Sequence, residues 1–357
     1  MNATTDHPYR LIETSTELEQ FVNRIDKEKI LAVDLEGDSM FHYQEKVCLV
    51  QMAGNGENVV IDPLKATDLS PLAPLFKDST ICKVFHGADY DVRSLYRDFG
   101  IEINNLFDTQ LASMFLGERE TSLEAVVSHR FGIKLDKRYQ KKDWSQRPLP
   151  DGMIEYAASD VFHLIPLARL LMDALKEKGR LGWVKEECAL LSEVRPAEND
   201  SEPLFLRFRG AGRMPRRNLA ALEGLKIATE LADTPQAMET HRCLSAKQIR
   251  IYGKPLARIV KKAKSLATKD LPVYPRKQRP SVAPRVPERI KAIKAWRDDL
   301  ADRLDLDPAL LFNKVLMTAI AVKNPSNTRE LGTVEGIRNR QVEAFGKDVV
   351  NVLSALP

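Results

Sequence analysis

The sequence predicts an α/β domain over residues 1–195, followed by two small all-α domains. Up to residue 195, apolar strand-like runs alternate with segments of helical spacing, a pattern typical of a sheet covered by helices. After residue 216, apolar residues recur at helical spacing, and the sequence carries no strand pattern. Polar, proline-broken stretches over residues 196–216 and 271–281 predict linkers between these parts.

The predicted sheet is built around one buried strand. Residues Ile30–Val33 form an aliphatic run that suits the centre of a sheet. "KVCLVQMAG" and "NVVIDPL" follow, and the turn-forming "GNGEN" between them predicts a hairpin that continues the sheet. A helical "LSPLAPLFKD", the strand "ICKVF", a helix over residues 89–99 and the short "NNLFDT" come next, before further helices. These elements predict a sheet whose faces are largely covered.

The helical half contains an internal repeat. Residues 247–260, "KQIRIYGKPLARIV", align without a gap with residues 340–353, "RQVEAFGKDVVNVL". The two segments share a glutamine, an aromatic residue and a Gly-Lys pair, which predicts two related modules over residues 217–270 and 282–357. The first module is the shorter one. Chance similarity between amphipathic helices is the alternative.

Charge is distributed unevenly along the chain. The net charge is +4, but residues 1–200 carry 24 Lys and Arg against 34 Asp and Glu, a balance of −10. Residues 201–357 carry 30 against 16, a balance of +14. This asymmetry suggests a polyanion that one part of the chain holds and the other processes. A solvated, highly charged surface is the alternative interpretation.

Composition argues against several other classes of protein. The N-terminal residues lack the basic start, apolar core and cleavage site of an export signal, and no apolar run approaches the roughly 18 residues of a membrane span. We therefore expect a soluble, cytoplasmic protein with no membrane association, and the sequence gives no reason to predict an obligate protein partner. The four cysteines form no CxxC or Cys/His cluster, which favours reduced thiols over a zinc site.

Acidic residues stand at places where the pattern predicts burial or a cleft. Asp34 and Glu36 directly follow the strand of residues 30–33, and because strand side chains alternate, both project from one face of the sheet. Asp91 lies at a junction between a strand and a helix. Tyr156 and Asp160 are four residues apart, so they share one face of a helix that begins after Pro150.

Converging carboxylates destabilise a fold unless a cation or a proton neutralises them. Oxygen ligands with few histidines fit Mg²⁺ or Mn²⁺ and argue against zinc. Two such ions about 4 Å apart can activate a water and stabilise the leaving oxygen of a phosphodiester. The acids therefore predict phosphoryl hydrolysis.

Each acidic position also has a simpler interpretation. A DxE pair at a strand end is more often a salt-bridged or solvated pair than a metal site. Asp89 and Asp108 could be helix caps, since each stands at the predicted start of a helix. His86 is better explained as a hydrogen-bonded structural histidine than as a metal ligand.

The three acidic segments also resemble a known family. "VDLEGD", "HGADYDVRSL" and "YAASDVFHL" are similar to the three motifs of the 3′-to-5′ exonucleases with four acidic residues and a tyrosine. "VCLVQM", "FDTQLASMFLG" and "LDKRYQKKDWSQRPL" resemble the ribonuclease D family, so that the similarity spans roughly residues 10–190. The repeated helical modules resemble the HRDC domain, which that family carries in two copies.

The resemblance implies a ribonuclease H-like α/β exonuclease domain with a mixed sheet of five to six strands flanked by helices, then two HRDC-like domains. The implied domain boundaries are 1–195 for the exonuclease domain, 196–216 for a linker, 217–270 for a short first HRDC-like domain, 271–281 for a proline-rich linker and 282–357 for the second HRDC-like domain.

The resemblance also implies a role for each matching residue. Asp34 would bridge two ions, Glu36 and Asp160 would complete one site, and Asp91 would serve the second ion, through water. Tyr156 would orient the attacking water rather than act as a free base, because a phenol has an unperturbed pKa of about 10. The implied cofactors are two divalent ions, Mg²⁺ or Mn²⁺.

The implied activity is hydrolysis of RNA from its 3′ end, with release of 5′-mononucleotides and precursor tRNA as a typical substrate. A DNA exonuclease of the same fold and an inactive nucleic-acid-binding adaptor are the alternatives. Lys142, Trp144 and Arg147 are candidates for nucleic-acid contact, because an aromatic residue among cations suits base stacking and phosphate binding. Trp144 could equally pack against the start of the next helix.

Overall fold

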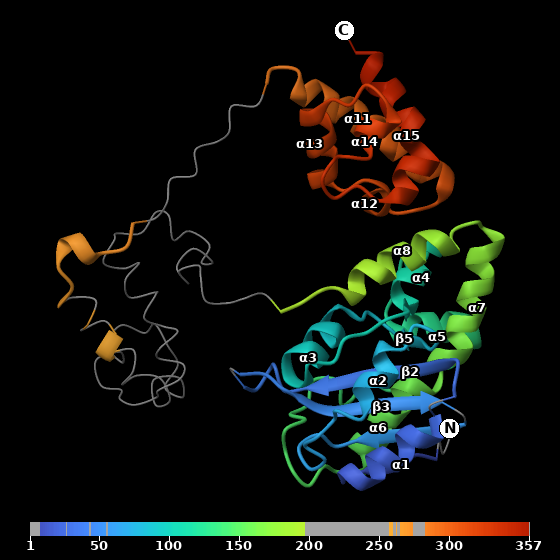
Figure 1. Cartoon of the computed structure of the whole chain (residues 1–357), viewed down its shortest axis with the longest axis vertical. Coiled ribbons are helices and arrows are strands. Elements are labelled where there is room, and N and C mark those ends of the chain that lie inside the picture. Colours follow the sequence, from blue (N-terminus) through green and yellow to red (C-terminus); the bar gives the residue numbers. More distant parts are fainter. Residues whose placement is uncertain are drawn as a thin grey trace. The chain divides into compact units, whose positions relative to one another are not determined.

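Figure 1 presents the computed structural model of the chain. It describes residues 8–196 except 26, 43 and 55, then residues 257–259, 262, 265–273 and 283–356. The predicted first HRDC-like domain, residues 217–270, therefore lies almost wholly outside the described residues, and so does most of the linker over residues 271–281. The predicted boundaries of these parts stay predictions.

Six strands form one mixed sheet, in agreement with the prediction. They are β1 (Arg10–Ile12), β2 (Ile30–Gly37), β3 (Val47–Gly54), β4 (Glu57–Ile61), β5 (Cys82–Phe85) and β6 (Leu106–Asp108). Their order across the sheet is β1-β4-β3-β2-β5-β6. Strand β3 runs antiparallel to both β2 and β4, which confirms the predicted hairpin, and the other neighbouring pairs are parallel.

The apolar residues of β2 place this strand near the middle of the sheet. Leu31, Ala32 and Val33 are fully buried, as expected for a strand that is covered on both faces. The pairing of β2 with β3 becomes irregular between Glu36 and Gly37. An irregularity of this kind bends the strand and changes the direction of its side chains. Asp34 and Glu36 are therefore held in regular pairing with β3, and the strand bends directly after them.

In the N-terminal part of the chain, helices flank the sheet. They are α1 (Ser15–Ile25), α2 (Leu72–Lys77), α3 (Asp89–Phe99), α4 (Thr109–Leu116), α5 (Leu123–Phe131), α6 (Asp151–Phe162), α7 (Leu164–Glu177) and α8 (Leu181–Ser192). Helix α6 packs against β2, β3 and β4, while α7 packs against β2 and β5. The apolar residues of α7 join the sheet in the main hydrophobic core, whereas most of those of α6 form a separate cluster with residues of β3 and β4. The acidic end of β2 thus lies beside α6.

The C-terminal helices form a second hydrophobic core. They are α11 (Val286–Leu304), α12 (Pro308–Leu311), α13 (Lys314–Lys323), α14 (Thr328–Leu331) and α15 (Asn339–Ser354). Ile293, Phe312, Ile320 and Val349 are fully buried at its centre. No strand is found among the described residues of this part, which agrees with the predicted all-α domain. Among the described residues, no helix has the length and apolar character needed to cross a bilayer.

Candidate metal centre

Three carboxylates converge where β2 meets α6. Asp34 and Glu36 project from the end of β2, and Asp160 projects from α6. One oxygen atom of each lies within 4.8 Å of the others, and the described residues hold no second group of this kind. Hard divalent cations take carboxylate oxygens as ligands. The three side chains therefore fit a Mg²⁺ or Mn²⁺ ion.

The three acids disfavour one another's ionised form. Burial raises the pKa of Asp34 to about 7. Burial, followed by the charges of Asp34, Asp160 and Asp91, raises the pKa of Glu36 well above its usual range. Burial and the charge of Asp34 do the same to the pKa of Asp160. A bound cation would offset both the cost of burying the charged carboxylates and the repulsion between them. The raised pKa values therefore suit a metal centre.

Asp91 is a fourth acid near the cluster of three. It lies in the first turn of α3, and its side chain is 6% exposed. Its pKa is raised by burial, then by the charges of Asp34 and Asp108. It does not belong to the group of three whose oxygens lie within 4.8 Å of one another. Asp91 therefore faces the same site from the side of α3 without joining the cluster of three.

Asp108 fixes the start of two helices. Its buried carboxylate accepts hydrogen bonds from the backbone N–H groups of Gly87 at 2.9 Å and Ala88 at 2.8 Å, just before α3. It also accepts from Gln110 at 2.8 Å and Leu111 at 3.3 Å, which makes it the N-cap of α4, one of the roles considered for it. Asp108 thereby ties the loop that carries α3 and Asp91 to the edge of the sheet.

The second predicted cap, Asp89, has another role. It is the first residue of α3 and pairs with Arg93 one turn further on, at 2.8 Å.

His86 is a structural residue, as expected. Its Nδ1 lies 2.9 Å from the Thr109 hydroxyl oxygen and its Nε2 lies 2.9 Å from the Thr121 carbonyl oxygen. Because both ring nitrogens have protein partners, His86 is not placed to bind a metal.

A close approach holds α3 against the end of β2. The hydroxyl oxygen of Tyr90, the neighbour of Asp91, lies where a Cβ on Gly37 would be only 2.6 Å away. Only glycine leaves room for this contact. The same hydroxyl donates to Glu45 at 3.3 Å. The contact links the residue before Asp91 to the residue after Glu36, and so relates the two acidic segments.

Tyr156 is held rigidly beside the acids. It forms a hydrogen bond with Asp160, and its ring lies between Tyr139 and Trp144, with centroid separations of 6.0 and 6.1 Å. Burial, followed by the charges of Asp160 and Glu36, raises its pKa far above the usual range. The phenol therefore keeps its proton at neutral pH. As a neutral hydroxyl, it can orient a water molecule.

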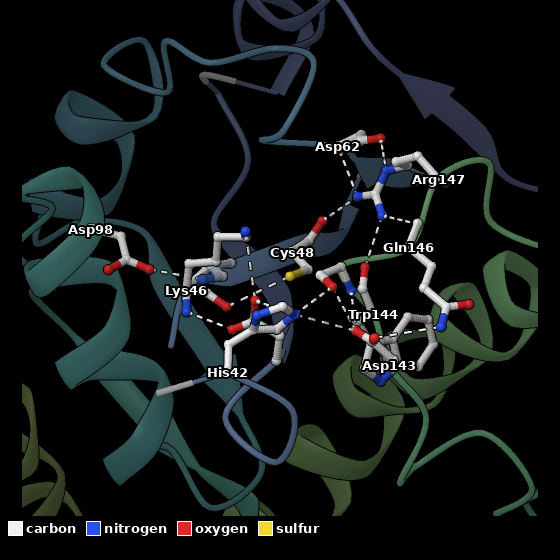
Figure 2. Close-up of polar contacts among 12 residues, drawn as sticks. His42, Lys46, Cys48, Asp62, Asp98, Asp143, Trp144, Gln146 and Arg147 are labelled. Atoms are coloured by element: carbon white, nitrogen blue, oxygen red, sulfur yellow. Dashed lines mark hydrogen bonds and ion pairs between the residues drawn. The ribbon is translucent and has the colours of Figure 1, made fainter. Parts of the chain in front are cut away.

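Two of the predicted nucleic-acid contacts are internal. Trp144 is 1% exposed, so its ring is not available for base stacking, and packing before α6 explains it instead. Figure 2 shows Arg147 bonded to both oxygens of Asp62, at 2.7 and 2.8 Å, and to the carbonyl oxygens of Cys48 and Trp144. These bonds hold the segment before α6 in place. Lys142 is exposed, and its proposed contact with nucleic acid stays a prediction.

The chain matches two family models. The model described as 3′-5′ exonuclease matches residues 9–176, and the HRDC domain model matches residues 287–353. Both matches agree with the resemblance inferred from the motifs. The HRDC match covers the second of the two predicted helical domains.

Several curated relatives are named Ribonuclease D. One from Gluconacetobacter diazotrophicus is 38% identical over 201 residues, which cover 56% of this chain and 51% of the relative. One from Granulibacter bethesdensis is 28% identical over 367 residues, which cover 95% of this chain and 91% of the relative. The matches to the first two relatives thus span only about half of their length, 51% and 56%.

Two solved structures are also similar to this chain over nearly its whole length. Escherichia coli RNase D, described as an exoribonuclease involved in structured RNA processing, has a TM-score of 0.70 at 26% identity, with 98% of this chain and 100% of that chain covered. The catalytic core of RRP6 from Trypanosoma brucei has a TM-score of 0.54 at 24% identity, with 99% and 80% covered. The second of these is a likeness of fold alone.

Replacing Asp108 with Asn should destabilise the protein. The amide can accept fewer of the four backbone hydrogen bonds and would turn an N–H group toward backbone donors. We expect the free energy of unfolding to fall by about 2–4 kcal/mol, because buried hydrogen bonds to a charged group are strong. Urea denaturation would measure this, and an unchanged midpoint would contradict the role given to Asp108.

Replacing Glu36 with Gln should stabilise the metal-free protein. The raised pKa means that folding is penalised once pH rises above the ordinary value of the carboxyl group, 4.5. In EDTA, the variant should be more stable than the wild type by about 1–3 kcal/mol at pH 8 and nearly equal to it at pH 4. Thermal denaturation at both pH values would test this. A variant less stable at pH 8 would contradict the electrostatic account.

Proposed function

We propose that the chain is a metal-dependent exoribonuclease that shortens RNA from its 3′ end, because residues 9–176 match a 3′-5′ exonuclease model and several curated relatives are named Ribonuclease D. The observation that carries the proposal is the convergence of Asp34, Glu36 and Asp160 within 4.8 Å, with Tyr156 bonded to the last of them. Oxygen-rich centres of this kind suit phosphodiester hydrolysis.

Four acids would hold the metal. Asp34 would bridge two divalent ions, Glu36 and Asp160 would complete one site, and Asp91 would serve the other through water. The separation of Asp91 from the cluster of three supports its assignment to the second ion. When bound, two such ions lower the pKa of an attacking water and stabilise the leaving oxygen. The ions would also offset the repulsion among the buried acids.

Tyr156 would orient the attacking water. Its hydroxyl is fixed by Asp160 on one side, and its ring is fixed by Tyr139 and Trp144. Because its pKa is raised, the phenol keeps its proton and donates a hydrogen bond to Asp160, and the phenol oxygen can accept a hydrogen bond from an O–H group of the attacking water. Orientation of a reactant by a rigid group contributes to rate through proximity.

RNA is the preferred substrate in this proposal. Curated relatives named Ribonuclease D and the structure of an exoribonuclease support it. The charge balance of +14 over residues 201–357 would attract the phosphate backbone, and binding should therefore weaken as salt rises. Trimming of tRNA 3′ ends is the specific activity we propose, with structured RNA 3′ ends as the wider class.

Replacing Asp34 with Asn should abolish cleavage while RNA still binds. The change removes a metal ligand, and we expect cleavage to slow by at least about a thousandfold. The rate of cleavage would be measured with RNA labelled at the 3′ or at the 5′ end, in the presence of Mg²⁺ or Mn²⁺. Wild-type protein should release the 3′ label first, as a mononucleotide. A DNA strand of the same sequence tests the alternative of a DNA exonuclease.

The matched control for this experiment is Asp89→Asn. Asp89 is an acidic residue only two positions before Asp91. Its side chain, however, is 60% exposed and pairs with Arg93. This variant should keep near-normal cleavage. Undiminished cleavage by the Asp34 variant would contradict the proposed function, and so would faster removal of the 5′ label.

Replacing Tyr156 with Phe removes one hydroxyl and keeps the ring. The contacts with Tyr139 and Trp144 remain, so the melting temperature and RNA binding should be nearly unchanged. We expect kcat to fall by about 10²-fold, since a small misplacement of a reactant can cost that much in rate. Single-turnover cleavage at saturating protein would test this, and an unchanged rate would exclude a role for the hydroxyl.

A further inference from the structure

Gln51 stands directly opposite Asp34 in the sheet. The Cα atoms of these two residues are paired in the antiparallel ladder between β3 and β2. Residues opposite each other in such a ladder project from the same face, with Cβ atoms about 4.5–5.5 Å apart. The side chain of Gln51 therefore starts beside Asp34, on the face where α6 packs against β2 and β3.

The carboxamide of Gln51 is buried and has no partner. Gln51 is 0% exposed, and neither its Nε2 nor its Oε1 forms a hydrogen bond within the described part of the chain. Its partner on the other side, in β4, is Val60, which offers no polar side-chain atom. A buried polar group without a partner is costly, and such groups are uncommon in folded proteins. The described part of the protein thus offers the carboxamide no partner that would explain a glutamine at this position.

We propose that Gln51 is a positioning residue of the metal centre, and that its Nε2 donates a hydrogen bond to the Asp34 carboxylate when a divalent cation is bound. The inference rests on the function proposed above. Asp34 is then held as a carboxylate, which is the stronger acceptor for an N–H donor. The carboxamide gains the partner that it otherwise lacks, and Asp34 is held in one orientation for the cation.

This arrangement should strengthen metal binding without contributing to the fold. The cost of the unpaired carboxamide falls on the metal-free protein and is relieved when the cation binds, so the relief adds to the affinity for the metal. Groups that hydrogen-bond to metal ligands commonly change metal affinity by about 10-fold to 100-fold. A residue that only packs the sheet would behave in the opposite way, because its loss would lower stability and leave metal affinity unchanged.

The test is the variant Gln51→Met, which keeps the length of the side chain and removes both polar atoms. Calorimetric titration of the full chain with Mn²⁺ should show binding about 10-fold to 100-fold weaker than in the wild type. The melting temperature in EDTA should be equal to that of the wild type or higher. The Mn²⁺ concentration for half-maximal RNA cleavage should rise, while the rate at saturating Mn²⁺ stays near that of the wild type.

Gln51→Leu provides a second variant should the methionine disturb the packing. Ser113→Ala is the matched control, because Ser113 in α4 is also fully buried and its hydroxyl also has no partner in the described chain. The control should bind Mn²⁺ as the wild type does.

Two outcomes would overturn the inference in different ways. If wild-type protein binds Mn²⁺ and Gln51→Met binds it equally well, Gln51 has no positioning role and the proposed function stands. If wild-type protein binds no Mn²⁺, the metal centre itself is wrong, and the role of Gln51 is overturned with it.

Discussion

The main constraint on the structure is the mutual repulsion of three carboxylates, Asp34, Glu36 and Asp160, which the fold brings together and partly or fully buries. Asp34, Glu36 and Asp160 have oxygens within 4.8 Å of one another, and burial raises the pKa of each. Their convergence works against folding, so the remaining structure has to supply the energy that holds them. The fully buried aliphatic residues of β2 and the packing of α6 on three strands supply it.

Polar contacts around the acids define their positions. Asp108 holds the loop before α3 through backbone hydrogen bonds, and Arg147 holds the segment before α6 through a partly buried ion pair with Asp62. Breaking either one would leave buried charge without a partner, which makes both contacts strongly selective for one arrangement. The acids come from a strand and from two helices, and each of the two helices has its own anchor. Such anchors keep a metal centre preorganised before the cation arrives.

Local sequence patterns predicted much of the site. The alternation of strand side chains placed Asp34 and Glu36 on one face, and the four-residue spacing placed Tyr156 and Asp160 together on a helix. Contacts between distant segments could not be predicted in this way. Arg147 and Asp62 are 85 residues apart, and nothing in the sequence around Trp144 distinguishes a buried ring from a stacking platform. The register that sets Gln51 opposite Asp34 is likewise a property of the sheet and not of either strand.

The central claim is that bound divalent cations neutralise these carboxylates and thereby allow them to lie close together. X-ray diffraction from crystals of the protein soaked in Mn²⁺, recorded at the manganese absorption edge, would test it most directly. The account predicts an anomalous peak bonded to oxygens of Asp34, Glu36 and Asp160. A cluster of intact carboxylates with no anomalous peak at saturating Mn²⁺ would contradict it.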